Sequence, residues 1–293
     1  MLFNETKDYF TFQNETFETA GIFSLPFYKR NAICFPNFSI LLPKNNFLEN
    51  FMSFQSEAAK NFEALKNNEY PGRGIILGTS PCGNYFVQVY WIMGRSINSR
   101  NRIFELESNG FLKTKAFDES KCSDPHLIIY YPAKHLENVH IITNGDQTDT
   151  IFSAIQLGGT FESALNTRIY EDDAPNFTPR ISGIIYKAEK PIYKLSILKS
   201  KNNTEEAGCM RYTYTYEKAL PGLGHFISTY KENGNPIPSF EGEPVLMPVA
   251  KNAEETLESY WNALNAENKV SLMVKWIDRK TFEAKTLVKN KLG

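Results

Sequence analysis

Long apolar runs, closely spaced cysteines and a surplus of either charge are missing from this sequence. No stretch approaches the roughly 20 apolar residues that a membrane-spanning helix needs, and the mean hydropathy is −0.38. Lys and Arg total 32 against 33 Asp and Glu, which argues against a generally basic nucleic-acid-binding protein. We therefore expect a globular protein with no membrane or nucleic-acid partner.

Signals for secretion, metals and common cofactors are missing as well. The first ten residues include Asn, Glu, Lys and Asp and do not resemble a signal peptide. We therefore expect a cytoplasmic protein whose 4 cysteines are reduced. The 4 histidines lack metal-ligand spacing, and there is no Walker loop, GxGxxG or HExxH. We expect neither a metal nor a cofactor.

The apolar pattern predicts a layered α+β protein. With 293 residues, folding should bury roughly three quarters of the chain's surface, enough for a large core. Strands are expected at 74–78, 85–93, 102–107, 111–117, 127–131, 139–143, 181–186, 192–198, 211–216, 225–230 and 270–276. Helices are expected at 46–67, 146–158, 160–166 and 252–264. Residues 85–93 are apolar on both faces, which indicates burial between two layers.

Two polar clusters suit anion binding. Residues 94–102 hold Arg95, Arg100 and Arg102 between two expected strands. Guanidinium and hydroxyl groups suit a phosphate, although a solvated basic turn is the alternative. Residues 144–149 open an expected helix, whose free N–H groups can bind an anion. A simple helix cap, with Asp146 as the capping side chain, explains the same residues.

Two further clusters combine charge with glycine or proline. Residues 70–74 surround Arg73, and residues 170–180 place three acidic side chains near Arg180. Adjacent carboxylates can raise one pKa toward neutrality, which serves proton transfer. A solvated acidic loop is the alternative, and no single cluster is a specific motif.

Taken together and in this order, the clusters resemble the archaeal-type IMP cyclohydrolase family and its bacterial relatives. The similar stretches are 70–74, 94–102, 144–149, 170–181, 229–230 and 238–244. The resemblance implies closure of the purine ring of 5-formamidoimidazole-4-carboxamide ribotide, giving IMP and water without a cofactor or metal. It also implies a fold similar to the N-terminal-nucleophile hydrolases, a four-layered αββα sandwich. Gly72 and Arg73 open the expected first strand without a nucleophile, so we expect a non-covalent mechanism.

The resemblance also suggests roles for individual residues. We expect Glu171 to be the general acid/base, with Tyr170 and Arg180 tuning it or supplying donors, and Arg73 to polarise a carbonyl. The expected 5′-phosphate ligands are Arg95, Ser99 and Arg102, with Arg100 as a fourth. The residues expected to hydrogen-bond the ribose or the carboxamide are Asn144, Asp146 and Gln147.

The resemblance divides the chain into three segments, which we expect to form one compact unit. They are a Phe-rich extension that packs on the core (1–69), the cyclohydrolase-like domain (70–244) and a helix–strand extension (245–293). The two extensions would add packing or an interface between copies of the chain. Two other functions stay open. One is an amidohydrolase on the same scaffold that uses Cys82, and the other is a purine-nucleotide-binding protein without turnover.

Overall fold

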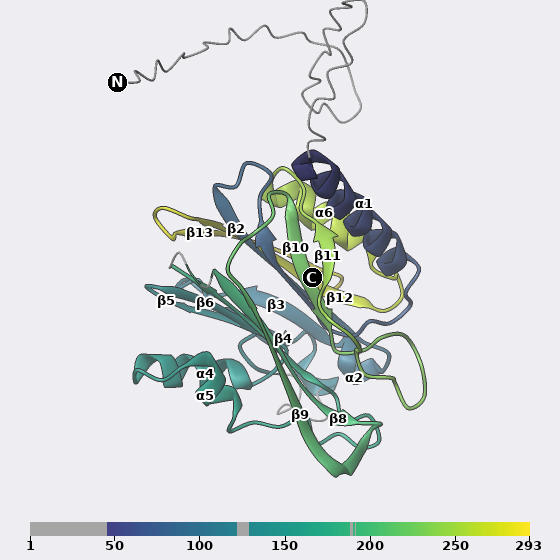
Figure 1. Cartoon of the computed structure of the whole chain (residues 1–293). Coiled ribbons are helices and arrows are strands. Elements are labelled where there is room, and N and C mark those ends of the chain that lie inside the picture. Colours follow the sequence, from purple (N-terminus) through teal and green to yellow (C-terminus); the bar gives the residue numbers. More distant parts are fainter. Residues whose placement is uncertain (1–45, 122–128, 188–189, 191) are drawn as a thin grey trace, which may run out of the picture. The chain divides into compact units, whose positions relative to one another are not determined.

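Two antiparallel sheets form the body of the protein in the computed structural model, which describes residues 46–121, 129–187, 190 and 192–293 (Figure 1). The six-stranded sheet has the order β11 (Val245–Pro248), β10 (Leu223–Ser228), β1 (Gly74–Thr79), β2 (Tyr85–Met93), β12 (Lys269–Asp278) and β13 (Ala284–Asn290). The seven-stranded sheet has the order β3 (Arg102–Leu106), β4 (Leu112–Ala116), β5 (Ala133–Leu136), β6 (Val139–Thr143), β7 (Arg180–Tyr186), β8 (Tyr193–Lys201) and β9 (Thr204–Tyr216).

The main core lies between the two sheets. Both faces of strand β2 are packed. Tyr90 packs toward the seven-stranded sheet, whereas Trp91 packs on the opposite face of its own sheet. Both residues are fully buried. The expectation that 85–93 is buried on two faces is therefore confirmed, and β2 occupies an interior position in its sheet.

Helices cover the outer face of each sheet. Side chains of α1 (Asn46–Lys66) and α6 (Ala253–Ala263) pack with the outer face of the six-stranded sheet. Helices α4 (Gln147–Gln156) and α5 (Phe161–Leu165) pack on the other sheet. The short helices α2 (Ile97–Arg100) and η1 (Glu119–Lys121) lie in connections. The predicted mixed sandwich is thus observed as helix, sheet, sheet and helix layers (Figure 1). None of the helices in the described ranges has the length and apolar character that crossing a membrane requires.

Helix starts follow local capping chemistry at α2, α5 and α6, but not at α4. Thr160 and Ser163 form a reciprocal capping box at α5, and the Asn252 side chain accepts the Glu255 N–H at α6. The prediction that Asp146 caps α4 is wrong, because its side chain makes no capping hydrogen bond. The carboxylate is paired with arginines instead, as described below.

Other local differences have physical causes. Residues 129–131 are not a strand, and β5 begins only after Pro132, whose nitrogen has no N–H to donate. Residues 127–128 of that expected strand lie outside the described residues, as do 1–45 of the Phe-rich segment. Strands β11 and β13 were not predicted. Strand β13 carries two lysines, and its residues are at most half-buried. Of the cysteines, Cys82 and Cys209 are free, and the other two lie outside the described ranges.

Candidate active site

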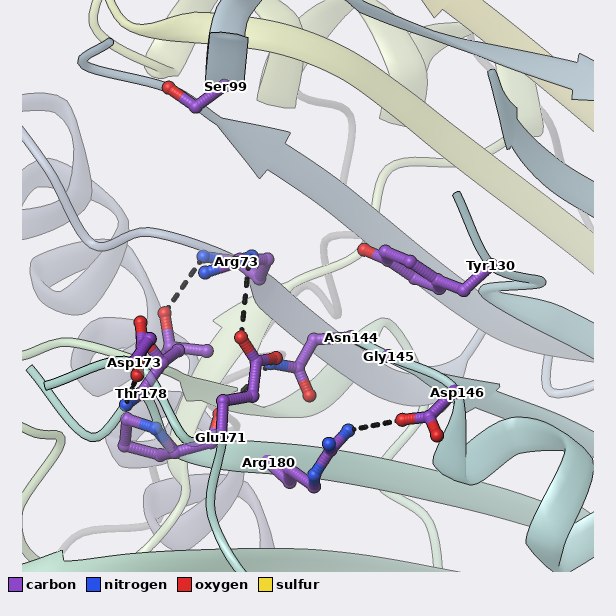
Figure 2. A network of polar contacts seen from close by, with 12 residues as sticks. Arg73, Ser99, Tyr130, Asn144, Gly145, Asp146, Glu171, Asp173, Thr178 and Arg180 are labelled. Atoms are coloured by element: carbon purple, nitrogen blue, oxygen red, sulfur yellow. Dashed lines mark hydrogen bonds and ion pairs between the residues drawn. The ribbon is translucent and has the colours of Figure 1, made fainter. Parts of the chain in front are cut away.

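A buried ion pair joins the two sheets at one end of the sandwich. Arg73 directly precedes β1, and Glu171 lies in the loop between α5 and β7. Arg73 Nη2 is 3.8 Å from Glu171 Oε2, and the two side chains are only 12% and 8% exposed. Figure 2 shows the two groups facing each other, with Asn144, Arg180 and Tyr130 around them. The expected acid/base residue and the expected carbonyl-polarising residue are therefore brought together.

Gly72 sets the position of Arg73. Its φ is +73°, and a Cβ there would lie 2.2 Å from Thr229 Oγ1 and 2.5 Å from the Tyr230 ring. Only glycine fits both the backbone conformation and the space. The Arg73 N–H then donates to Thr229 Oγ1 at 3.1 Å, which fixes the chain just before β1.

Glu171 is buried beside two arginines and an amide donor. Its N–H donates to the Thr178 carbonyl at 2.9 Å, and Asn144 Nδ2 donates weakly to its Oε1 at 3.4 Å. Burial raises the pKa of Glu171 above its ordinary value, although the charges of Arg73 and Arg180 oppose this. A carboxyl group of raised pKa can give up a proton near neutrality.

Arg102 is a second buried guanidinium beside Arg73. It is 1% exposed, its Nε donates to the Ser99 carbonyl at 2.8 Å, and its Nη2 donates to the Met93 carbonyl at 3.2 Å. Burial and the charge of Arg73 lower the pKa of Arg102. Arg102 Nη1 and Arg73 Nε have no hydrogen-bond partner within the described ranges. Buried guanidinium groups with unused N–H donors have the chemistry that an anion requires.

The polar residues at the start of α4 form a closed network. Gln147 Nε2 donates to Asn144 Oδ1 at 2.9 Å, and Asn144 Oδ1 also accepts the Ile181 N–H at 2.8 Å. Arg180 Nη1 donates to Gln147 Oε1 and to Asp146 Oδ1, both at 2.7 Å. Asn144, Gln147 and Arg180 therefore connect α4 to β7 beside Glu171.

Asp146 lies at the exposed side of this network. Its side chain is 55% exposed and pairs with Arg168 and Arg180. Burial opposes ionisation, but hydrogen bonds from the arginines outweigh it and lower the pKa of Asp146. These stronger partners explain why Asp146 does not cap the helix.

Three candidates of the 94–102 cluster point elsewhere. Arg95 is exposed, donates from Nη1 to Asn233 Oδ1 at 2.7 Å, and lies 5.0 Å from the Tyr70 ring centroid. Arg100 donates to the Gly94 carbonyl at 2.9 Å and to Asn268 Oδ1 at 3.0 Å. Ser99 completes the capping box of α2, since its Oγ accepts the N–H of the N-cap Ser96, and its carbonyl accepts the Arg102 Nε–H.

Tyr170 also contacts a different part of the structure. Its buried ring packs edge-on against Phe177 with centroids 5.5 Å apart. Burial raises the pKa of its phenol, and the charges that act on it come from Glu205, Cys209 and Asp172. Tyr170 is thus adjacent to Glu171 in sequence, while its electrostatic neighbours lie on β9 and in its own loop.

Several tyrosines near the ion pair were missed from the sequence. The hydroxyl groups of Tyr90 and Tyr130 are 2.9 Å apart, and Figure 2 shows the Tyr130 hydroxyl directed toward Arg73. Tyr230 contacts Thr178 at 2.6 Å between oxygens. Tyr230 lies in the similar stretch at 229–230, which was the available signal, whereas Tyr90 is hidden within an apolar strand.

The described residues contain no group of three or more His, Cys, Asp or Glu side chains that could hold a metal ion. The arrangement instead offers one carboxyl group of raised pKa, two buried guanidinium groups and phenolic hydroxyls. These groups suit the binding of an anionic substrate and proton transfer at a carbonyl.

Comparison with known proteins identifies a matching family. A family model described as IMP cyclohydrolase-like protein matches residues 70–281. The chain belongs to this IMP cyclohydrolase-like family. Curated relatives named IMP cyclohydrolase include one from Methanococcus maripaludis strain S2, 32% identical over 188 residues, 57% of this chain and 92% of the relative. One from strain C7 is 34% identical over 188 residues, again 57% and 92%. One from Methanosphaera stadtmanae is 28% identical over 173 residues, 56% and 75%.

The segment of this IMP cyclohydrolase-like chain that the family model matches contains the whole site. Residues 70–281 include the Arg73–Glu171 pair, Arg102 and the α4 network. The match also reaches through β12, which lies beside β2 in the six-stranded sheet.

Proposed function

We propose that this chain is an IMP cyclohydrolase. It closes the ring of 5-formamidoimidazole-4-carboxamide ribotide, a small-molecule substrate, and releases IMP and water in the cytoplasm. The observation that carries the proposal is the buried Arg73–Glu171 pair beside Arg102, within a chain that belongs to the family. Its relatives are named IMP cyclohydrolase.

The reaction needs little beyond positioning and proton transfer. The carboxamide nitrogen attacks the formyl carbon of the same molecule, so holding the reactive conformer supplies much of the rate. Arg73 polarises the formyl carbonyl, and the carboxyl group of Glu171 gives a proton to its oxygen. Tyr130, which lies beside β4, supplies a hydroxyl donor. The carbinolamine then loses the formyl oxygen as water.

Arg102 is the residue of the 94–102 cluster that we assign to the substrate's anionic group. Its Nη1 is the unused donor, and Ser99 orients it through the carbonyl at 2.8 Å. Arg95 and Arg100 are instead exposed and bonded to Asn233 and Asn268. We therefore assign these two arginines to the framework around the site.

The layer order also supports a relationship to the N-terminal-nucleophile hydrolases, which we propose as the fold class. In that class the first strand of the core starts with a nucleophile, whereas Gly72, Arg73 and Gly74 stand there in this chain. A mechanism without a covalent intermediate follows. The amidohydrolase alternative through Cys82 receives no support, because the thiol is exposed in the turn after β1, and Arg73 precedes that strand.

The test is direct conversion by the purified full chain. Chelator-treated protein is incubated with the formamido ribotide, and IMP is measured by absorbance and chromatography. We expect IMP to form, and we expect Glu171→Gln to lower kcat by about 100-fold or more while IMP still raises Tm. Asp172→Asn, an exposed neighbour, is the matched control and should keep its activity. A Tm shift without turnover in the wild type would indicate a nucleotide-binding protein, and loss of turnover on alkylation of Cys82 would indicate the amidohydrolase.

A further inference from the structure

A row of hydrogen bonds runs from Tyr230 to the edge of the site. The Tyr230 hydroxyl lies 2.6 Å from Thr178 Oγ1, and the Thr178 hydroxyl contacts Asp173 Oδ2. The Thr178 N–H also donates to Asp173 Oδ1 at 2.6 Å. Thr178 is 0% exposed and Tyr230 is 3% exposed, whereas Asp173 is half-buried. The row therefore joins a buried phenol to a carboxylate that reaches solvent.

The chemistry of the three groups gives the row a direction. An ionised carboxylate only accepts, so the single hydroxyl proton of Thr178 is donated to Asp173. The Thr178 oxygen then accepts the proton of Tyr230. The Tyr230 oxygen keeps its lone pairs, which are available to accept a proton from a bound molecule.

Tyr230 stands beside the ion pair at the centre of the site. The neighbouring Thr229 Oγ1 accepts the Arg73 N–H at 3.1 Å, and the charge of Arg73 acts on the Tyr230 phenol. Thr178 carries the row and also accepts the Glu171 N–H on its carbonyl at 2.9 Å. Figure 2 shows Thr178 and Asp173 on one side of Arg73 and Tyr130 on the other. Two carboxyl groups, Glu171 and Asp173, thus serve one site through different paths.

The proposed ring closure requires two proton carriers in its addition step. As the new N–C bond forms, the carbonyl π pair moves to the formyl oxygen, which takes a proton from Glu171. The attacking nitrogen must lose one proton in the same step. If the Tyr230 oxygen takes it, the Tyr230 proton passes to Thr178 and the Thr178 proton passes to Asp173. The step ends with Glu171 ionised and Asp173 neutral, and solvent restores both.

We propose that Tyr230, Thr178 and Asp173 form a proton relay that accepts the proton lost by the attacking nitrogen, separate from the acid Glu171. Tyr230 is the catalytic residue of this relay, and Thr178 and Asp173 act through it. The inference rests on the proposed cyclohydrolase function, because it assigns the second proton path of that reaction.

Two substitutions at Thr178 separate a relay from a merely structural contact. Thr178→Val keeps the shape and removes the hydroxyl, whereas Thr178→Ser keeps the hydroxyl and removes the methyl group. For a relay we expect Thr178→Val to lower kcat by about 100-fold with KM unchanged, and Thr178→Ser to stay close to the wild type. If only packing matters, Thr178→Val is active and Thr178→Ser is impaired.

The remaining measurements test the path itself. Tyr230→Phe and Asp173→Asn should both lower kcat with KM unchanged. Tyr186→Phe, at the far end of β7, is the control and should match the wild type. Each variant's melting curve with IMP reports folding and binding independently of turnover. An active wild type with Thr178→Val and Tyr230→Phe at wild-type rate and pH profile would overturn the relay alone. A wild type that forms no IMP would overturn the cyclohydrolase function, and the relay with it.

Discussion

The hydroxyl oxygens of Tyr90 and Tyr130 lie 2.9 Å apart, although Tyr90 belongs to the six-stranded sheet and Tyr130 lies beside the seven-stranded one. Tyr90 is on β2. The Tyr130 carbonyl accepts the Thr114 N–H of β4, and the Tyr130 N–H donates to Thr114 Oγ1. The Tyr90 ring also stacks on Phe104 at 5.6 Å between centroids. The hydroxyl contact between Tyr90 and Tyr130 therefore connects the core between the sheets to the phenol that faces Arg73.

Removing either hydroxyl of this pair should destabilise the fold by about 1 kcal/mol. Tyr90→Phe and Tyr130→Phe each leave a buried hydroxyl without its partner, so the double variant should lose less than the sum of the two. Urea unfolding of the four proteins in a double-mutant cycle measures the coupling. Strict additivity would show that the hydroxyl groups do not interact.

Inorganic phosphate should bind the two buried guanidinium groups in the absence of substrate. At about ten times its dissociation constant it should stabilise the protein by about 1.4 kcal/mol, a Tm increase of about 3 °C. Arg102→Met should abolish this increase, because it removes the unused N–H donor. Arg100→Met is the matched control, since Arg100 is exposed and bonded outside the site. Equal phosphate shifts in the two variants would place the anion elsewhere.

Lys275 is an ammonium group in the core between the sheets. The residue is 2% exposed, and its Nζ lies 3.5 Å from His140 Nδ1. Burial lowers the pKa of Lys275 from 10.5 to about 8, and burial together with Lys275 lowers the pKa of His140 from 6.5 to about 2. Compared with the unfolded chain, the folded state therefore shifts both side chains toward their neutral forms.

The free energy of unfolding should rise with pH between about 8 and 10.5, the range in which Lys275 titrates differently in the folded and unfolded states. Between its folded pKa of about 8 and its ordinary value of 10.5, the unfolded chain holds more protons than the folded chain. Below this range both states are protonated and the burial cost is present in full. Lys275→Met should therefore stabilise the protein at pH 7 by up to about 3 kcal/mol and flatten the rise. Urea unfolding at several pH values, against the exposed Lys218→Met, checks this. A destabilised Lys275→Met with the slope intact would contradict it.

Gly74→Ala should destabilise the fold next to Arg73. A Cβ at Gly74 would lie 2.1 Å from Cζ2 of the fully buried Trp91, its cross-strand partner on β2. Displacing a buried indole ring costs about 1–3 kcal/mol or more. Gly242→Ala is the comparison, because Gly242 has φ +86° with nothing within 4 Å. Its cost is only the backbone penalty, about 1 kcal/mol. Unfolding curves of similar midpoint for both variants would show that Trp91 can move.

The layered α+β architecture was predictable because its signals are local. The doubly apolar run at 85–93, the Thr160 capping box and the Asn252 cap each depend on neighbouring residues. Strand β13 was not predictable in this way. Its outer positions are lysines, and it is a strand because β12 offers it a partner along seven residues.

The site was predictable in its charged centre and not in its surroundings. Arg73 and Glu171 stood out as charges next to glycine and proline. Arg95 and Arg100 look equivalent to Arg102 in sequence. In the structure they are exposed and donate hydrogen bonds to Asn233 and Asn268, which lie more than 130 residues away along the chain. The roles of Asn144, Asp146, Gln147, Tyr170 and Arg180 in the reaction stay predictions.

The side chain of Asn290 forms the two hydrogen bonds that a neighbouring strand would otherwise form with Phe104. Its Oδ1 accepts the Phe104 N–H at 2.9 Å, and its Nδ2 donates to the Phe104 carbonyl at 3.1 Å. This pairing occupies backbone groups of β3, the edge of one sheet, from β13, the edge of the other. In the same way Asn61 of α1 donates to the Leu246 carbonyl on the edge strand β11 at 2.9 Å. Amide side chains thus occupy backbone groups of two edge strands, β3 and β11, which leaves fewer free groups there for strand-to-strand association between molecules at high concentration.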